Sequence, residues 1–546
     1  MWMRKPFLVV VLLALLSLGL FAFPGRAAAA TCTWNVTSGN WSEITNWTGC
    51  IAAPGAGDTA IINSGTVTLD IPVTVLDLTL NNGTITGSND LSITGSFTWN
   101  NGTMSGNGVT NLAATGTMTT SGSGSLTLNA RTFNNAGTVN WNSTGYLNMT
   151  NSAVFNNLNG ATFNVQTAGT YVIYGSTATF NNMSGATFTK SSSGSTGIQN
   201  LTAFNNAGTL TLTSAGVLNL GPAGTSIHTG PFNISNANAT LTFQSGIHNL
   251  NAGANITGSG NVTFDGGTEY VHSTYNLSGT TLVSGGTANF PSDVTLTSLG
   301  SALTISGGSL DLSSGESLSV PSLTMSSGTL NGADTITVTT SLNWSGGTMS
   351  GTGATNLAAT GTMATSATGS VNLNGRTFNN AGTVNWSSTG YLNMTNSAVF
   401  NNLNGATFNT VSSGSYLIYG STGNLVNGGT LNLPASGAII ANQFTQTASG
   451  VINMSVAGTV ARTDFCQITG TTSNLNGRLN LTHAGAYNPA FGDYLDVLLY
   501  TNHTGTFSLV YLPALDPGLA WGVSYRTDRL RLQILRGILI PLIIKP

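Results

Sequence analysis

Three ionisable residues near the middle of the chain have the side chains that general acid–base catalysis uses. Asp265, Glu269 and His272 lie within one short stretch that also contains a Gly-Gly pair. Two carboxyl groups, or a carboxyl group and a histidine, can donate and accept the proton when a glycosidic bond is hydrolysed. Sequence spacing alone does not bring these side chains together, and exposed positions beside a glycine corner are the simpler interpretation. We therefore predict no catalytic residues.

The other histidines and the late aspartates are poor candidates for a metal site. Zinc ligands recur at short, characteristic spacings, which are not found among the remaining histidines: His228, His248, His483 and His503. Calcium takes six or more oxygen ligands, and Asp493 and Asp496 alone cannot supply them. The Gly-Gly-Asp nonapeptide of calcium-binding repeats does not recur in this chain. We expect no metal ion and no cofactor.

The chain also lacks the charge that nucleic-acid binding requires. Charged residues make up 5% of the sequence, and the formal net charge is -3. The densest basic group consists of four arginines: Arg526, Arg529, Arg531 and Arg536. Four arginines near the end of the chain are too few for a phosphate-binding surface, and a solvated strand face explains them. We expect no nucleic-acid partner.

Six tyrosines form two related groups whose rings could stack on sugars. They are Tyr146, Tyr171 and Tyr174, with their counterparts Tyr391, Tyr416 and Tyr419. Aromatic residues also favour strands, where a core column or packing at a strand edge would account for them. Core or edge packing is our prediction, and sugar stacking is the alternative.

A repeated framework carries these residues. The phrase Phe-Asn-Asn, one or two variable residues and then Gly begins at Phe133, Phe155, Phe180 and Phe204, at intervals of 22 to 25 residues. That period is typical of one coil of a solenoid. A longer repeat contains this phrase. Residues 97–177 return at 342–422, shifted by 245 positions with about three quarters of the residues identical. The chain therefore stacks similar units.

The local pattern predicts strands rather than helices. Apolar side chains occupy every second position in segments such as 138–141, 146–149 and 209–212, and Gly, Asn, Thr and Ser interrupt each apolar run before it reaches helical length. We predict an all-β fold, a right-handed parallel β-helix (β-solenoid) with an N-terminal cap and a C-terminal β-rich closing module. About 15 coils are expected between residues 97 and 450, in a rod on the order of 70 Å long.

The Phe-Asn-Asn-Gly phrase has a physical interpretation in this fold. Equivalent side chains stack from coil to coil, so the four phenylalanines should form one inward column. The asparagines after them should form ladders at the corners, where Asn and Gly tolerate left-handed backbone.

Composition changes along the chain predict its organisation. The segments are a signal peptide (1–30), an N-terminal cap segment (31–96), repeat block A (97–220), divergent coils (221–341), repeat block B (342–450), a C-terminal closing module (451–536) and a short apolar tail (537–546). The tail is far shorter than the about 20 apolar residues of a spanning helix, so we favour a last strand over a sorting or docking tail. After removal of the signal peptide no stable membrane span is expected.

The leader also sets the chemical environment that we expect. Arg4 and Lys5 precede an apolar run, and small residues at 27–30 precede a predicted cleavage near Thr31. In an oxidising compartment Cys32 and Cys50 can close a short disulfide loop, although two unpaired thiols remain the alternative. Cys466 is then odd, and we expect it to be a buried thiol. Hydrophobic residues make up 40% of the chain, which favours a folded protein over a disordered one.

Both ends of the chain carry motifs that resemble known secreted β-helix proteins. The first segment resembles an eight-glycine-type N-terminal segment through Asn40-Trp41-Ser42, Asn46-Trp47, Pro54-Gly55-Ala56-Gly57-Asp58 and 65–70. The last resembles the closing module of bacterial surface β-helix proteins, which are autotransporter-passenger-like and adhesin-like, through motifs at 464–470, 475–479, 489–493, 505–507 and 519–525. The resemblance implies surface display or release, and it implies no catalytic residues.

Taken together, these features predict a secreted or cell-surface structural or adhesive β-solenoid without catalytic activity. Its partners would be glycans or cell-surface and matrix components, and its location extracellular or on the cell surface. The alternative is a polysaccharide-binding or polysaccharide-degrading protein on the same scaffold.

Overall fold

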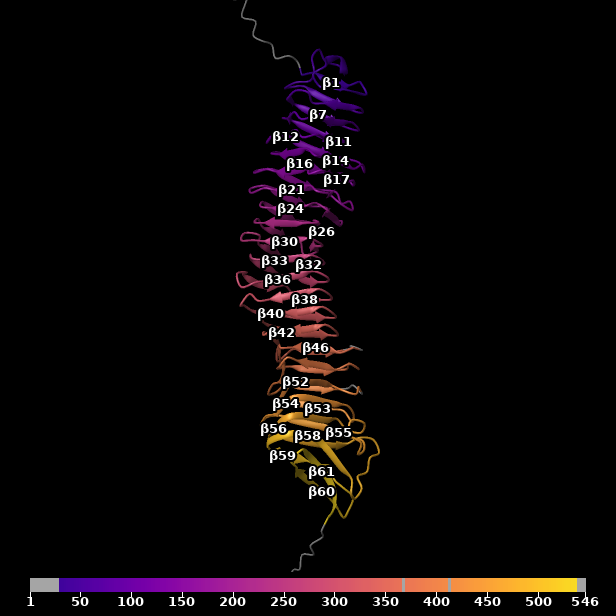
Figure 1. The fold of residues 1–546 in the computed structure, drawn as a ribbon, viewed down its shortest axis with the longest axis vertical. Helices are drawn as coiled ribbons and strands as arrows, with labels where there is room; N and C mark the ends of the chain where they lie inside the picture. The colour runs from indigo at the N-terminus through magenta and orange to yellow at the C-terminus, as the bar shows by residue number, and fades with distance from the viewer. Residues whose placement is uncertain (1–28, 366–368, 411–413, 538–546) are drawn as a thin grey trace, which may run out of the picture.

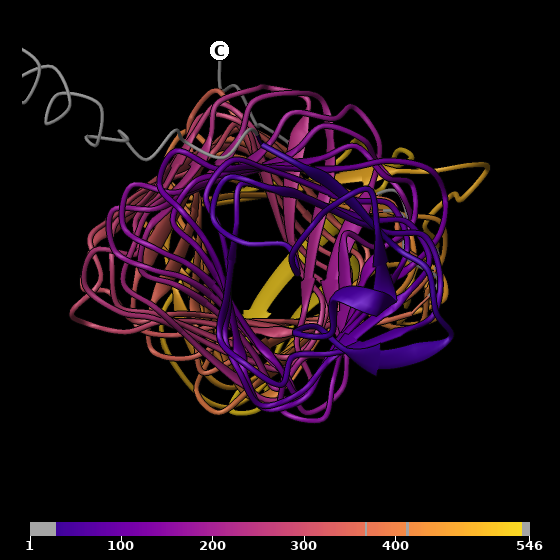
Figure 2. The ribbon, with the colours of Figure 1, turned by 90° about the horizontal axis from the view of Figure 1, so that it is seen from above.

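Alternating apolar and polar residues give this chain short strands with one buried face. The computed structural model describes residues 29–365, 369–410 and 414–537, in which there are 61 strands and one 3-10 helix, η1 (Ile44–Asn46). The strands wind about 18 turns of a parallel β-helix and form a long rod (Figure 1). Seen from above, the coils superimpose around one axis (Figure 2). The predicted all-β parallel β-helix is confirmed.

Each coil contributes one strand to each of three faces. In one coil these are β16 (Thr138–Trp141), β17 (Leu147–Thr150) and β18 (Val154–Asn157). Each pairs in parallel with its equivalent in the next coil, so that Thr138 lies beside Thr162 and Phe155 beside Phe180. We call the rows that contain β16, β17 and β18 the first, second and third faces.

The three faces account for the strands of the rod. The first face begins as a 14-stranded sheet: β3 (Trp47–Thr48), β1 (Thr31–Trp34), β4 (Thr59–Ile62), β7 (Asp77–Leu80), β10 (Ser96–Trp99), β13 (Thr117–Thr120), β16, β19 (Thr162–Val165), β22 (Thr187–Lys190), β25 (Thr209–Leu212), β28 (Phe232–Ile234), β31 (Ile256–Gly258), β34 (Tyr275–Leu277) and β37 (Leu296–Leu299). The second face contains β2 (Ser38–Asn40), β5 (Thr66–Thr68), β8 (Thr84–Thr86), β11 (Gly102–Ser105), β14 (Leu126–Asn129), β17, β20 (Ile173–Gly175), β23 (Thr196–Gln199), β26 (Gly216–Gly221), β29 (Ala239–Phe243), β32 (Asn261–Phe264), β35 (Thr280–Val283) and β38 (Ala302–Ile305). The third face contains β6 (Val73–Val75), β9 (Leu91–Ile93), β12 (Val109–Leu112), β15 (Thr132–Asn135), β18, β21 (Thr179–Asn182), β24 (Ala203–Asn206), β27 (Thr225–His228), β30 (Ile247–Leu250), β33 (Thr268–Val271), β36 (Thr287–Phe290), β39 (Ser309–Leu312), β41 (Thr329–Asn331), β43 (Thr348–Ser350), β46 (Val371–Asn374) and β49 (Leu392–Thr395).

Farther along the rod, long strands run across two faces. The first and second faces share β40 (Ser317–Met325) and β42 (Thr335–Trp344), and the third and first faces share β52 (Ile418–Asn427), β54 (Ala438–Gln446), β56 (Gln467–Leu475) and β58 (Tyr494–Gly505). The first face also has β44 (Ala354–Leu357), β47 (Thr377–Asn380) and β50 (Val399–Asn402). The second face also has β45 (Thr362–Thr365), β48 (Thr383–Trp386), β51 (Thr407–Thr410), β53 (Thr430–Leu433), β55 (Val451–Val456), β57 (Arg478–His483) and β59 (Leu509–Tyr511).

The core consists of columns of like side chains along the rod axis. Phe133, Phe155, Phe180 and Phe204 are buried, and their rings stack with centroid separations of 4.9, 4.9 and 5.7 Å. Such stacked burial removes a large aromatic surface from water in every coil. The predicted inward phenylalanine column is confirmed.

The asparagines of the phrase form ladders, but our prediction that they lie at left-handed corners is wrong. They belong to the strands themselves, and the left-handed asparagines are instead Asn151, Asn200 and Asn396. Strand alternation turns the two asparagines of each phrase to opposite sides. The outer ladder runs through Asn111, Asn134, Asn156, Asn181 and Asn205, with four amide hydrogen bonds of 2.9 Å. The buried ladder runs through Asn135, Asn157, Asn182 and Asn206 at 2.7 to 2.8 Å.

The glycine of the phrase is required by the close approach of successive coils. A Cβ on Gly137 would lie 2.1 Å from the carbonyl oxygen of Gly116, which belongs to the coil before. The backbone N–H of Gly137 donates to Oδ1 of Asn135 at 3.0 Å, which fixes the turn that ends the strand. The phrase therefore combines a core side chain, two ladder amides and a tight corner.

Asn157→Ala should destabilise the rod more than the adjacent Asn156→Ala. Asn157 accepts from Asn135 and donates to Asn182 and to the carbonyl of Thr187, all in the interior. Its loss leaves buried polar groups unpaired, which costs about 2–3 kcal/mol, whereas water replaces the partners of Asn156 at a cost below about 1 kcal/mol. Urea unfolding of the two variants measures the difference, and equal losses would contradict it.

Two arginines lie completely inside the rod, at equivalent positions of the two long copies. Arg131 donates from Nε to the hydroxyl of Thr110 and from its two Nη atoms to four backbone carbonyls, those of Gly87, Ser105, Asn89 and Val109. Arg376 makes the equivalent five bonds, to Thr355, Gly332, Ser350, Asp334 and Ala354. These bonds use all five N–H donors of a guanidinium and reach back 44 residues. Each arginine thereby ties three coils together.

The two long copies do not occupy the same faces of the rod. The Phe-Asn-Asn strands β15 and β18 of the first copy lie on the third face, and their counterparts β47 and β50 lie on the first. Register shows the offset: the column that begins with Phe133 continues through Ala288, Leu310 and Met349 to Leu373, which is the counterpart of Leu128. A column of phenylalanines in one copy is thus a column of leucines and methionines in the other.

Both ends of the rod are covered. At the start, Trp34 and Trp41 pack edge-on against Trp47 at 5.0 and 4.8 Å, and β3 runs antiparallel to β1. The disulfide predicted between Cys32 and Cys50 is confirmed, and Cys466 is a buried free thiol. Parallel pairing already begins between β1 and β4, within the predicted cap segment.

The C-terminal end is closed by antiparallel strands. β61 (Arg529–Arg536) pairs antiparallel with β58, and β60 (Leu519–Tyr525) pairs antiparallel with β61 (Figure 1). This arrangement covers the last coil, where parallel strands would otherwise leave backbone groups unpaired. The predicted signal peptide and apolar tail lie outside the described residues, except for their innermost positions. Among the residues that the structure describes, no helix has the length and apolar character to cross a membrane.

Candidate functional site

The structure separates the three residues that could have formed a catalytic site. Asp265 is exposed at the corner after β32 and accepts a hydrogen bond from the Ser284 hydroxyl at 2.7 Å. Glu269 points inward from β33 and has no exposed surface. His272 lies on the outside beyond β33, and its Nδ1 lies 2.9 Å from a carboxyl oxygen of Asp293. The interpretation of all three as exposed residues is wrong for Glu269, and the three side chains do not converge.

The interior beside Glu269 holds two hydrogen-bonded histidines that lie far apart in the sequence. Nε2 of His228 lies 3.0 Å from Nδ1 of His248, whose own Nε2 lies 3.1 Å from the carbonyl oxygen of Ser245. Nδ1 of His228 accepts from the backbone N–H of Asn206, so each ring can act as donor at Nε2 and acceptor at Nδ1. His248 then pairs in register with Glu269 in the next coil. Spacings of 20 and 21 residues, close to one coil, were the signal for this cluster.

Burial keeps all three of these groups uncharged near neutral pH. Burial raises the pKa of Glu269 to about 9, and neither carboxyl oxygen has a hydrogen-bond partner. Burial lowers the pKa of His248 to about 4, and burial together with the neighbouring His248 lowers the pKa of His228 further below its usual range. In the parts of the chain that the structure describes, no three His, Cys, Asp or Glu side chains are grouped to hold a metal ion. The cluster lies in the core, away from any substrate.

Asp496 forms ion pairs with two of the late arginines, Arg529 and Arg531. Asp496 accepts from Nε of Arg531 at 2.7 Å and from Arg529 at 3.0 Å. Partial burial opposes ionisation of Asp496, but the hydrogen bonds and charges of the two arginines together lower its pKa. The guanidinium of Arg531 also lies 3.9 Å from the ring centroid of Tyr494. The prediction that these residues are ordinary strand and turn residues fits this arrangement.

The outside of the rod is lined by regular rows of hydroxyl and amide groups. On the first face Thr117, Thr138, Thr162, Thr187 and Thr209 follow one another in register. On the third face the outer asparagine ladder runs parallel to that row. Each ladder amide uses one donor and one acceptor within the ladder and keeps further hydrogen-bonding capacity for a ligand. Strand spacing repeats these groups about every 4.8 Å.

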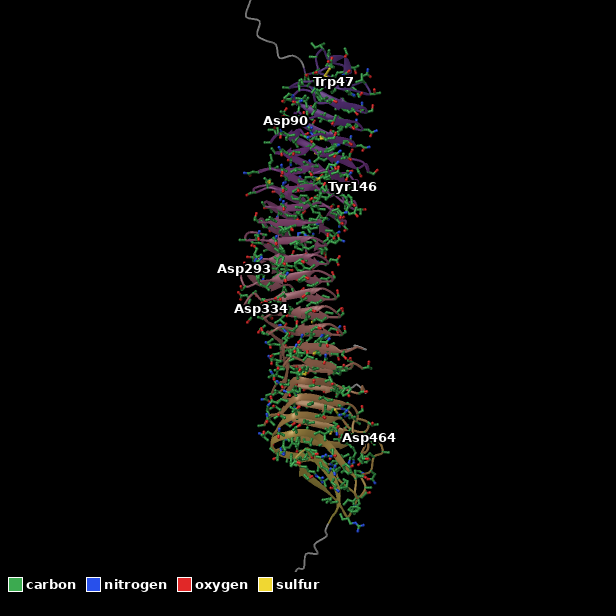
Figure 3. All side chains as sticks on the ribbon, in the orientation of Figure 1. Trp47, Asp90, Tyr146, Asp293, Asp334 and Asp464 are labelled. Atoms are coloured by element: carbon green, nitrogen blue, oxygen red, sulfur yellow. A yellow bond between two sulfur atoms is a disulfide. The ribbon has the colours of Figure 1, made fainter. Side chains whose placement is uncertain are left out.

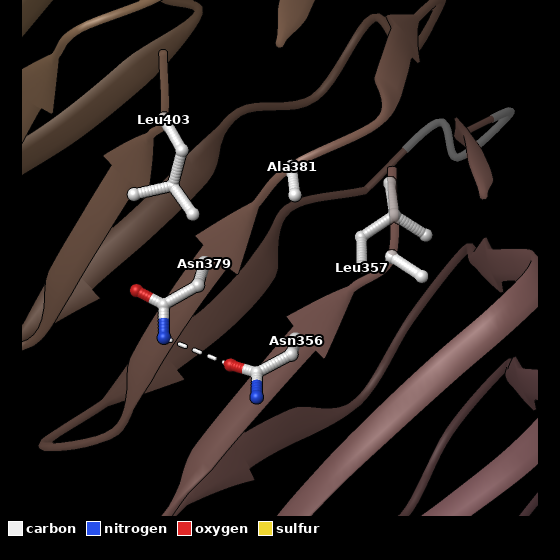
Figure 4. Close-up of a pocket in the computed structure, with 6 residues that line it drawn as sticks. Asn356, Leu357, Asn379, Ala381 and Leu403 are labelled. Atoms are coloured by element: carbon white, nitrogen blue, oxygen red, sulfur yellow. Dashed lines mark hydrogen bonds between the residues drawn. The ribbon is translucent and has the colours of Figure 1, made fainter. Parts of the chain in front are cut away.

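A shallow hollow of about 420 Å³ lies beside the equivalent ladder in the second copy. Figure 4 shows the amides of Asn356 and Asn379 joined by their 2.8 Å hydrogen bond, with Leu357, Ala381 and Leu403 around the hollow. The arrangement places a row of amides beside a small apolar wall. Such a surface suits a neutral ligand that presents both hydroxyl and C–H groups.

The six tyrosines form two compact groups on the surface rather than a core column. In the first, Tyr146 lies 6.0 Å from Tyr171 and 5.7 Å from Tyr174, as centroid separations. Figure 3 shows Tyr146 at the outer edge of the rod. The second group, Tyr391, Tyr416 and Tyr419, repeats this arrangement. The predicted packing at strand edges is present, and packing in the core is wrong.

No model of a known protein family matches the sequence, and no curated protein matches it significantly.

Proposed function

We propose that this chain is a secreted or cell-surface structural and adhesive β-solenoid that acts without catalysis. The observation that carries the proposal is the regular exterior, on which amide and hydroxyl rows continue over many coils. Repetition lets many weak contacts add up along one rod, so affinity comes from area and number rather than from one pocket. Glycans or other neutral cell-surface and matrix polymers are the partners that suit such a surface.

Three further observations support this proposal, and the first of them counts against a polysaccharide-degrading enzyme. A glycosidase requires two carboxyl groups across one bond, and Asp265 and Glu269 lie on opposite sides of the rod wall. The disulfide between Cys32 and Cys50 suits an oxidising compartment. The predicted leader and the resemblance to secreted bacterial surface β-helix proteins agree with export. We therefore place the protein outside the cell or on its surface.

Adhesion measurements test the proposal. Beads coated with the purified protein are expected to hold to films of cell-envelope and matrix polysaccharide under flow. Replacing the outer ladder residues Asn134, Asn156, Asn181 and Asn205 with serine should lower retention at least tenfold, on the order expected when one of several linked contacts is lost. The pair Asn140→Ser and Asn164→Ser, on the first face, is the matched control.

The same experiment separates adhesion from turnover. Released reducing and unsaturated ends are measured in the solution above each film, and none is expected. Full retention of the ladder variant, or polymer cleavage that Asp265→Ala abolishes, would overturn the proposal.

A further inference from the structure

We propose that each tyrosine trio is a binding subsite for the sugar rings of a neutral polysaccharide. The inference rests on the proposed adhesive function and assigns it a ligand class and a location. The two trios are Tyr146, Tyr171 and Tyr174 in the first copy, and Tyr391, Tyr416 and Tyr419 in the second.

The rings of each trio lie against one another and remain partly exposed. Tyr171 and Tyr174 are 4.9 Å apart at their centroids with an interplanar angle of 42°, and Tyr416 and Tyr419 are 5.4 Å apart at 73°. Tyr419 has 39% of its surface exposed, and the other five side chains are half-buried. Edge-to-face packing fixes the orientation of the rings without covering all of them. The faces and edges that remain are available for C–H groups of a pyranose ring.

Buried side chains anchor the backbone beneath each trio. Val172 and Ile173 are buried between Tyr171 and Tyr174, and Leu417 and Ile418 are buried at the equivalent positions. Strand pairing places Tyr174 beside Asn148 and Gln199 on the outside of the second face. The rings are thus positioned before a ligand arrives, which reduces the entropy lost on binding.

Amides beside the first trio supply the hydrogen bonds that sugar hydroxyls require. The Asn200 side chain donates to the Tyr174 hydroxyl at 2.8 Å. Gln199, the next residue in the outward row, donates to Gln244. In the second copy, the residue of the next coil that pairs with Tyr419 is Ile440. In both subsites an asparagine of the coil before, Asn148 or Asn393, pairs with the tyrosine. The first subsite has further amides at Asn200 and Gln199, whereas the second has an apolar neighbour at Ile440.

The surroundings of both trios indicate that the ligand is uncharged. No Asp, Glu, Lys, Arg or His lies between Arg131 and Lys190, or between Arg376 and Arg462. These stretches contain both trios, and the charged residues that bound them nearest the trios, Arg131, Lys190 and Arg376, are buried inside the rod. An acidic polymer would find no cation there, and a phosphate or sulfate group would find no ion partner. Moving from water to such a surface costs a neutral glycan less desolvation free energy than it costs a charged polymer.

The distance between the trios suits a polymer rather than a small sugar. The trios are separated by eleven coils and one face, which corresponds to about 50 Å along the rod. Two subsites on one rigid rod can engage a single long chain, so the second contact forms at high effective concentration.

Binding of polysaccharides to tyrosine variants tests the inference. The probes are amorphous cellulose, chitin, a β-1,3-glucan and a mannan, with polygalacturonate as the acidic comparison. The unaltered protein is expected to bind at least one neutral polymer in preference to polygalacturonate. The pairs Tyr171→Ala/Tyr174→Ala and Tyr416→Ala/Tyr419→Ala should each lower the apparent affinity about tenfold or more, and all four changes should abolish binding. The matched control is Tyr270→Ala, a tyrosine 41% exposed outside the trios.

A footprinting measurement keeps the test independent of folding defects. A saturating oligosaccharide of the polymer that binds should protect the trio tyrosines of the unaltered protein from nitration, but not Tyr270. Failure of all four neutral polymers to bind, absence of protection, or full binding by the variant with all four changes would overturn the inference. Full retention of the ladder variant on the polysaccharide films, with intact tyrosine footprints, would instead count against the proposed adhesive surface alone.

Discussion

Arg131→Met is expected to lower the free energy of unfolding of the coils around β15 by about 3–5 kcal/mol. The replacement leaves the hydroxyl of Thr110 and four backbone carbonyls without their donor inside the rod. Burial already lowers the pKa of Arg131 to about 10, although the charge of Asp90 opposes this shift, and the charge is tolerated because every N–H is bonded. Arg376→Met should have a similar effect on the second copy.

Denaturant unfolding combined with hydrogen exchange measures this loss. Hydrogen exchange should accelerate in the three coils that each arginine ties together, and less in the other copy, since a solenoid transmits stability mainly between neighbouring coils. Arg462→Met, at an exposed position, is the control and should change stability by less than about 0.5 kcal/mol. A loss below about 1 kcal/mol for Arg131→Met would show that the five bonds contribute little.

Glu269→Gln is expected to stabilise the protein by about 3 kcal/mol at pH 7. The pKa of Glu269 is raised from 4.5 to about 9 in the folded protein, so folding holds a proton that the unfolded chain releases. The stability that this carboxyl group contributes is therefore complete below pH 4.5 and is lost as the pH rises toward 9. Glutamine cannot ionise, so the variant should lose this alkaline decline.

The buried histidines impose the opposite dependence on the acid side. Their folded pKa values lie below the ordinary 6.5, so their contribution is present above pH 6.5 and is lost as the pH falls, through about 4 for His248. Two histidines outweigh one carboxyl group below pH 6.5, so stability should peak at about pH 6.5, and Glu269→Gln should retain the acid decline. Urea midpoints between pH 4 and 9 measure both arms, with Asp265→Asn as the exposed control. A flat profile between pH 6 and 9 for the unaltered protein would contradict the prediction.

The period of the phrase made much of the fold predictable. Phe133 and its successors recur at one coil, so their stacking followed from spacing alone. The position of the asparagines could not be predicted from spacing, because the phrase does not show where a strand ends. Asn135 is the last residue of its strand and does not lie in a corner. Adjacent residues point to opposite sides of a strand, so an error of one position exchanges inside and outside.

The alternation of side chains along a strand also explains why the candidate catalytic residues do not meet. Glu269 is inside and His272 outside because they lie an odd number of residues apart on one extended segment. A spacing of about one coil separates His228, His248 and Glu269 along the chain. Metal-ligand patterns do not contain such a spacing, but a solenoid brings residues one coil apart side by side. The contacts of Arg131 reach back two coils, which no local pattern in the sequence indicates.

The offset between the two long copies has a consequence for how such a molecule can lengthen. Leucine and methionine in one copy continue the line of phenylalanine from the other, so the interior of one face accepts residues whose counterparts lie behind another face. A duplicated segment therefore need not span a whole number of windings, because the two copies in this chain are offset by eleven windings and one face. In this chain the offset carries the second tyrosine trio to the side of the strand lattice next to that of the first, so the copy has turned an aromatic group about the rod axis as well as moving it along.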